Sequence, residues 1–72
     1  MSIRLYTDDI NLLDEDELSL TLYVIREHMG LDPLFIKSIN KKKIHEALLS
    51  VENQLSETGK EVLQNILKKL FL

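Results

Sequence analysis

Residues 13–30 read LDEDELSLTLYVIREHMG, and this segment carries helix signals at both of its ends. Asp14 is a good N-cap, because its carboxylate can accept hydrogen bonds from the free amides of a first helical turn. Glu17 follows three residues later and completes the pattern of a capping box. At the other end, Gly30 can adopt the left-handed conformation that commonly closes a helix. The pattern predicts a helix that begins directly after Asp14 and ends just before Gly30.

Apolar residues occupy more than one face of this predicted helix. At about 100° per residue, one face consists of Leu18, Leu22, Ile25 and Met29. Leu20 and Val24 lie almost opposite, with Tyr23 between the two faces. A helix with two apolar faces either runs through the centre of a fold or is shared with a second chain. Residues 18–24 also alternate between apolar and polar as a strand does, but the helix caps favour the helix.

Three further helices are predicted along the rest of the chain. Asp32 and Pro33 form an N-cap followed by a first-turn proline, which predicts a short helix over residues 33–39. Residues 41–55 give the most regular pattern, with a single narrow apolar stripe. Thr58 starts the pattern of a second capping box and opens a last helix that reaches the C-terminus.

These elements predict an all-α fold, a small bundle of three to four helices that forms one domain over residues 1–72. The interpretation of residues 1–13 stays open. Ile3 and Leu5 alternate with polar neighbours as in a short extended strand, although no partner strand is apparent, whereas Thr7 could cap a helical turn. The residues expected in the core are Leu18, Leu22, Ile25, Met29, Ile44, Leu48, Val51, Leu55, Ile66 and Leu70.

The net charge of −3 conceals two halves of opposite sign. Residues 1–36 carry two arginines and eight acidic residues, a charge of −6, whereas residues 37–72 carry seven lysines and four glutamates, a charge of +3. An acidic half repels a phosphate backbone and favours a basic partner. The sequence contains no cysteine, no visible secretory signal and no run of about 20 apolar residues that could cross a membrane. We therefore expect a cytoplasmic protein without a membrane partner.

Patterns for catalysis and metal binding are missing from the sequence. Asp14 and Asp16 begin the spacing of a calcium loop, but no central glycine and distal glutamate follow. His28 and His45 are far apart and have no cysteine beside them, so they do not form a zinc-binding pattern. No serine lies in a glycine-flanked nucleophile elbow, and no glycine-rich phosphate loop is present. We therefore expect no enzyme activity, no cofactor and no metal.

A DNA-binding alternative rests on residues 22–41, whose apolar spacing resembles a helix-turn-helix motif with Gly30 at the turn. The basic residues that would contact nucleic acid are Lys37, Lys41, Lys42 and Lys43. Arg26, however, stands where the packing of the two helices usually needs a small residue. The predicted second helix also begins with apolar side chains rather than with groups that read bases. Nucleic acid is therefore the less favoured partner.

Apolar residues that the predicted core does not use favour a protein-binding module, such as a small regulator or inhibitor. The candidate binding residues lie on acidic and apolar helix faces and are Leu20, Tyr23, Val24, Phe35, Leu49, Asp14 and Asp16. An apolar patch with an acidic rim is typical of a site for a partner helix or of a dimer interface. We therefore predict contact with a protein partner or with a second copy of this chain in a homodimer.

Overall fold

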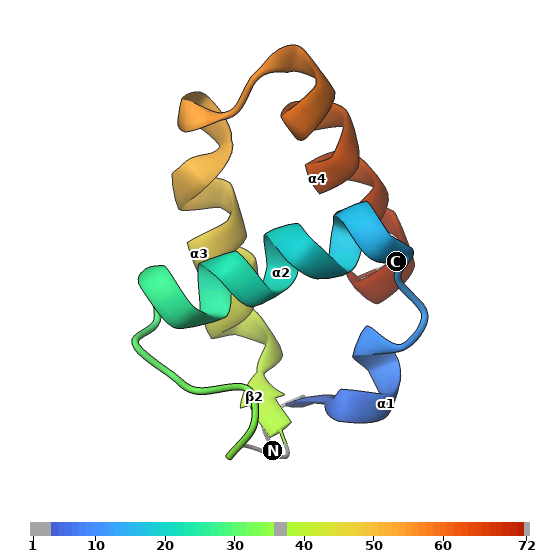
Figure 1. Cartoon of the computed structure of the whole chain (residues 1–72). Coiled ribbons are helices and arrows are strands. Elements are labelled where there is room, and N and C mark those ends of the chain that lie inside the picture. The colour runs from blue at the N-terminus through green and yellow to red at the C-terminus, as the bar shows by residue number, and fades with distance from the viewer. Residues whose placement is uncertain (1–3, 36–37, 72) are drawn as a thin grey trace.

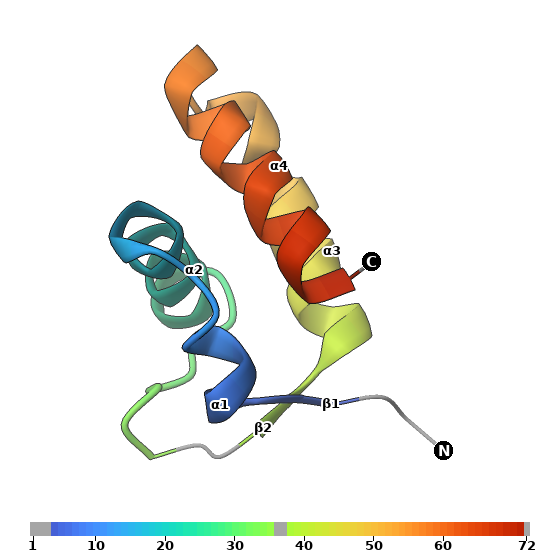
Figure 2. The ribbon, with the colours of Figure 1, turned by 90° about the vertical axis from the view of Figure 1, so that its right-hand side faces the viewer.

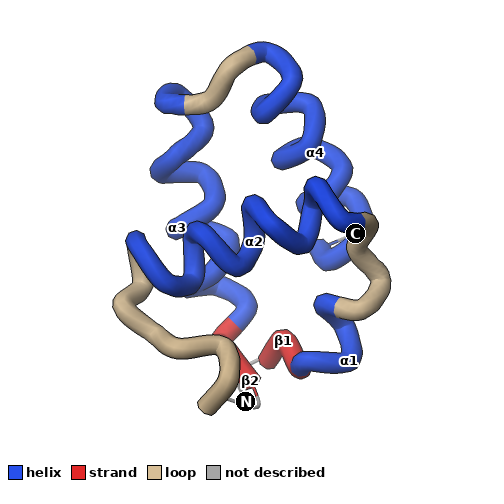
Figure 3. The backbone as a smooth tube through the Cα atoms, viewed as in Figure 1, coloured by secondary structure: helices blue, strands red, loops and turns tan. Residues whose placement is uncertain are grey.

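A computed structural model describes residues 4–35 and 38–71, and most of these residues lie in helices (Figure 1, Figure 3). The elements in chain order are β1 (Arg4–Tyr6), α1 (Thr7–Ile10), α2 (Glu15–Glu27), β2 (Ser38–Asn40), α3 (Lys41–Val51), a short 3-10 helix (Glu52–Gln54) and α4 (Glu57–Phe71). The prediction of a small, mostly helical fold is confirmed.

The three longer helices do not all run parallel or antiparallel. α3 and α4 form an antiparallel pair that the short 3-10 helix connects, and α2 crosses both of them (Figure 1, Figure 2). Near the end of α4 the Phe71 ring lies 5.0 Å from the His45 ring of α3, measured between centroids. The start of α3 is therefore close to the end of α4. Because α2 crosses the other two helices, the finer prediction of a three- to four-helix bundle is not confirmed.

The core lies where α2 meets α3 and α4. Its buried apolar residues are Leu13, Val24, Ile25, Ile39, Ile44, Leu48, Val51, Leu63, Ile66 and Leu70. Six of the ten residues expected in the core are among them, and Leu18, Met29 and Leu55 pack against the core while partly buried. Val24, which the sequence placed on a second, partner-binding face, is fully buried. The reason is that α2 contacts both α3 and α4, so its two apolar faces are both used within the chain.

The predicted capping of α2 is confirmed. The Asp14 Oδ1 atom accepts a hydrogen bond from the Glu17 amide at 2.9 Å, and the Glu17 Oε1 atom accepts one from the Asp14 amide at 3.0 Å. Gly30, just after the helix, has a φ of +66°, the left-handed conformation that was expected there. The local signals at both ends of α2 were therefore sufficient to place it.

The last two helices begin at caps that the sequence analysis did not identify, Asn40 and Ser56. α3 starts at Lys41 as predicted, with the Asn40 side chain accepting hydrogen bonds from two amides of its first turn. The predicted cap of α4 at Thr58 is wrong, because Ser56 takes this role: its Oγ atom accepts a hydrogen bond from the Gly59 amide at 3.1 Å. Thr58 lies inside α4.

The predicted helix over residues 33–39 is wrong within the part that the structure describes. Residues 33–35 form a turn and residues 38–40 form β2, while residues 36 and 37 lie outside the described part of the chain. β2 pairs antiparallel with β1, with Arg4 opposite Asn40 and Tyr6 opposite Ser38. This pairing supplies the partner strand that the sequence did not reveal. Both alternatives left open for residues 1–13 are found within the described residues, because β1 is followed by α1, which includes Thr7 rather than being capped by it.

Candidate functional site

The segment between α2 and β2 exposes two large apolar side chains at a tight turn. The Asp32 Oδ1 atom accepts a hydrogen bond from the Leu34 amide at 2.9 Å, and the Asp32 carbonyl accepts one from the Phe35 amide at 3.0 Å. These bonds hold the turn, and the Leu34 and Phe35 side chains project from it with 83% and 84% of their surface exposed. We refer to residues 31–35 as the apolar turn.

Exposure on this scale distinguishes the apolar turn from the rest of the surface. Single exposed apolar residues are common on soluble proteins and need no explanation. Here two consecutive large side chains are exposed on hydrogen-bonded backbone. Full burial of a leucine or phenylalanine side chain contributes about 1.5–3 kcal/mol, and the isolated chain gains almost none of this from either residue. Burial of the Leu34 and Phe35 side chains against a partner would provide this free energy.

Two more apolar residues, Tyr23 of α2 and Leu31 at the start of the apolar turn, are partly exposed. The Tyr23 ring meets the His28 ring edge-on, with 5.6 Å between centroids, and its side chain remains about half exposed. Leu31 follows Gly30, and its amide donates a hydrogen bond to the Ile25 carbonyl at 3.1 Å. Its side chain is also partly exposed. Exposed apolar side chains are therefore found both in the second half of α2 and in the turn that follows it.

The structure separates the residues predicted to bind a protein partner. Of these seven residues, only Tyr23 and Phe35 are both exposed and located in the second half of α2 or in the segment that follows it. Val24 is buried, Leu20 packs half-buried against the core, and the exposed Leu49 lies on α3. Asp14 and Asp16 are at the opposite end of α2, about 20 Å from its C-terminus by the rise of an α-helix. The fold therefore does not bring these seven residues together into an apolar patch with an acidic rim.

Leu34 was not among the predicted binding residues, because it falls within the helix predicted over residues 33–39. The signal that could have identified it is Asp32 followed by Pro33, which is as typical of a hydrogen-bonded turn as of a helix start. Leu31 was not predicted either, because it falls within residues 22–41, where it fits the apolar spacing of the helix-turn-helix alternative.

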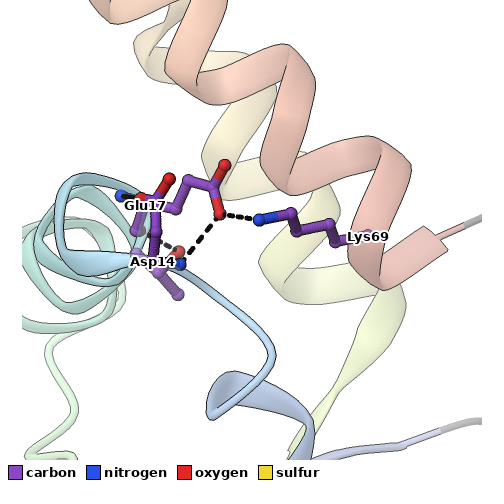
Figure 4. Close-up of polar contacts among 4 residues, drawn as sticks. Asp14, Glu17 and Lys69 are labelled. Atoms are coloured by element: carbon purple, nitrogen blue, oxygen red, sulfur yellow. Dashed lines mark hydrogen bonds and ion pairs between the residues drawn. The ribbon is translucent and has the colours of Figure 1, made fainter.

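The acidic start of α2 is occupied by a contact within the fold. Figure 4 shows the Lys69 ammonium of α4 reaching the Glu17 carboxylate, with 2.6 Å between Nζ and Oε1. The Glu17 side chain is 3% exposed, and the same Oε1 atom accepts the Asp14 amide of the capping box. The hydrogen bond to Glu17 is the main cause that raises the pKa of Lys69; partial desolvation lowers the pKa, and the negative charges of Glu17 and Asp14 raise it further. This cluster joins α2 to α4 and is a structural contact rather than a reactive site.

The lysines of the DNA-binding alternative lie at the start of α3. Lys42 and Lys43 are exposed, and the Lys41 Nζ atom lies 5.8 Å from the centroid of the Phe71 ring. Lys37 lies outside the described part of the chain. The helix that would have read bases is replaced by the apolar turn and β2 wherever the structure describes it. The helix-turn-helix pattern in residues 22–41 is therefore not realised as predicted.

Within residues 4–35 and 38–71, no group of three histidine or acidic side chains is arranged to hold a metal ion. In the same ranges, no helix has the length and apolar content required to cross a membrane. Comparison of the chain with family models, with curated proteins and with solved structures gives no match. The apolar turn with the adjacent end of α2 is the surface that most needs an explanation.

Proposed function

We propose that this protein is a small, non-enzymatic interaction module that binds a protein partner through the apolar turn and the end of α2. The observation that carries the proposal is the exposure of Leu34 and Phe35 on consecutive positions of a hydrogen-bonded turn. The two side chains are the anchors, and Tyr23 and Leu31 extend the contact surface towards α2.

The kind of partner follows from the shape of this surface. A projecting leucine–phenylalanine pair fits a pocket lined with apolar side chains, and aromatic anchors in such pockets commonly supply most of the binding free energy of an interface. The hydrogen bonds from Asp32 hold the backbone of the turn before binding, so less conformational entropy is lost when the anchors are buried. A partner with a preformed apolar pocket is therefore favoured over one that folds around the module.

The test is affinity capture of the tagged protein from its own cells, with nuclease present, followed by mass spectrometry. We expect one protein in near-equal amount, and we expect the double substitution Leu34→Ser and Phe35→Ser to abolish its recovery. The matched control is Leu12→Ser, because Leu12 is 62% exposed on the loop between α1 and α2, away from the apolar turn. Circular dichroism must show that both variants keep the helical content of the wild type.

The oligomeric state is measured in parallel by analytical ultracentrifugation, because a second copy of the chain can also supply the pocket. If the wild type is a dimer and the Leu34/Phe35 variant is a monomer, the partner is a second copy of the chain. Recovery of the same proteins by the wild type and by the Leu34/Phe35 variant, together with an unchanged oligomeric state, would refute the proposed function.

A further inference from the structure

Three consecutive lysines, Lys41 to Lys43, form the first turn of α3 directly after β2. Among the described residues, no carboxylate lies within ion-pair distance of them: the ion pairs found there join Lys60 to Glu57 and Lys69 to Glu17. Lys42 and Lys43 are both exposed. We refer to Lys41–Lys43 as the lysine row.

The lysine row does not serve the stability of the helix it begins. The positive end of a helix dipole repels cations, and the first turn of α3 contains no acidic residue to offset them. The Asn40 side chain already caps the turn by accepting hydrogen bonds from the Lys42 and Lys43 amides. Lys41 lies over the Phe71 ring, whereas Lys42 and Lys43 are exposed and form no ion pair with the described residues. Two exposed charges that work against the helix they begin are consistent with a partner outside the fold.

The lysine row and the apolar turn lie at the same end of the molecule. The three-residue strand β2 leads into α3, and such a strand spans about 10 Å. Figure 1 and Figure 2 both show the segment after α2, then β2, then the start of α3 together at the lower end of the fold. A partner of ordinary size that covers the apolar turn can therefore also reach the lysine row.

We propose that the partner of the apolar turn is an acidic protein surface, with an apolar pocket for Leu34 and Phe35 and carboxylates beside it that pair with Lys42 and Lys43. This inference rests on the proposed function and specifies the chemistry of the partner. It differs from the basic partner that the charge of the N-terminal half favours, because the lysine row lies at the same end of the fold as the apolar turn, although Asp32 within the turn is negative.

Two observations favour a protein over other polyanions. A phosphate backbone supplies charge but no apolar pocket, so it would leave Leu34 and Phe35 exposed. An anionic lipid surface would accept the apolar pair, but it would repel the exposed Asp32 carboxylate within the same turn. A folded protein can place an apolar pocket and carboxylates at separate positions and satisfy both groups.

The experiment measures, by fluorescence anisotropy, how tightly the labelled protein binds the protein recovered by affinity capture. The test variant carries Lys42→Gln and Lys43→Gln. The control is Lys60→Glu, which changes the net charge by the same two units near the start of α4, at the other end of the α3–α4 pair. We expect the test variant to lose about tenfold in affinity, equivalent to about 1.4 kcal/mol, and the control to bind as the wild type does. We also expect wild-type affinity to fall between about 50 and 200 mM salt.

Several results would overturn the inference. They are absence of binding by the wild type, equal binding by the lysine variant, and an equal loss in the Lys60 control. Tighter, lysine-dependent binding to duplex DNA or to vesicles of anionic lipid would also overturn it and would identify a different polyanion. The Leu34/Phe35 variant separates the two proposals: if it loses the captured protein while the lysine variant keeps it, the proposed function stands and the acidic partner does not.

Discussion

Glu17 of α2 and Lys69 of α4, 52 positions apart in the sequence, form an ion pair with 2.6 Å between the charged atoms. The Glu17 carboxylate is nearly inaccessible to solvent, whereas the Lys69 side chain is 40% exposed. Because the same carboxylate oxygen also accepts the Asp14 amide, one atom takes part both in the cap of α2 and in its contact with α4. The local signal that begins α2 is therefore also part of the tertiary structure.

The ion pair predicts a loss of stability at alkaline pH. The hydrogen bond to Glu17 raises the pKa of Lys69 in the folded state above its ordinary value. A raised pKa stabilises the fold below the unfolded pKa, about 10.4 for a lysine, and this stabilisation is lost as the pH rises through the folded pKa. We expect Lys69→Met to unfold at a lower urea concentration than the wild type at about pH 8, and the difference to shrink by about pH 11.5.

The matched control for this measurement is Lys60→Met. Lys60 also has an acidic neighbour, Glu57, but at 3.8 Å, and the Glu57 side chain is almost fully exposed. An exposed pair of this kind contributes little, so this variant should resemble the wild type at every pH. A wild-type advantage over Lys69→Met that stays constant up to the highest pH would contradict the role assigned to the pair.

The capping box predicts a measurable cost for losing the Asp14 side chain. Asp14→Ala removes the acceptor of the Glu17 amide and should reduce the free energy of unfolding by about 1 kcal/mol. Asp16→Ala is the control, because Asp16 lies in the same first turn but caps no amide, and only its favourable interaction with the helix dipole is lost. Equal destabilisation by the two substitutions, measured by urea unfolding, would show that the charge matters and the cap does not.

Local signals account for what the sequence predicted about the fold. Asp14, Glu17 and Gly30 lie within or next to the helix they delimit, so α2 could be placed without knowledge of the rest of the chain. The error over residues 33–39 has a non-local cause. Ser38 and Asn40 pair with Tyr6 and Arg4, more than thirty positions earlier, and no property of residues 33–39 specifies that pairing.

The candidate site shows the same division between local and non-local information. Phe35 was predicted to be a binding residue because it fell outside every apolar stripe, and its exposure agrees with that placement. Val24 was predicted because it lies on a second apolar face of its helix. It is buried, because α2 crosses both α3 and α4 and both apolar faces of α2 pack within the chain. The periodicity of one helix shows which side chains share a face, but it cannot show how many neighbours that helix has.

Gly30 predicts a backbone effect that involves no steric contact. A Cβ atom at this position would have no atom within 4 Å, so the cost of a side chain comes only from the φ of +66°. Gly30→Ala should reduce the free energy of unfolding by about 1–2 kcal/mol. Gly30→Asn should cost less, because asparagine adopts the left-handed conformation more readily than alanine does. If the two variants unfold at the same urea concentration, the left-handed conformation is not what makes glycine necessary there.

Val51 and Leu49 of α3 provide the sharpest test of the core, because they are two positions apart and differ in burial. Val51 is 1% exposed and Leu49 is 44% exposed. A carboxylate at position 51 would lose its hydration without gaining a partner, at a cost of several kcal/mol. The total stability of a chain of 72 residues is about 4–11 kcal/mol, so we expect Val51→Asp to abolish cooperative unfolding.

Leu49→Asp introduces the same charge into the same helix, but at a position where water reaches the carboxylate. We expect it to melt cooperatively within a few degrees of the wild type, since exposed substitutions usually change stability by about 0.5 kcal/mol or less. Thermal melting followed by circular dichroism distinguishes the two variants directly. Cooperative melting of Val51→Asp at the wild-type temperature would mean that α3 presents a different face to α2 and that the core of this fold is assigned to the wrong residues.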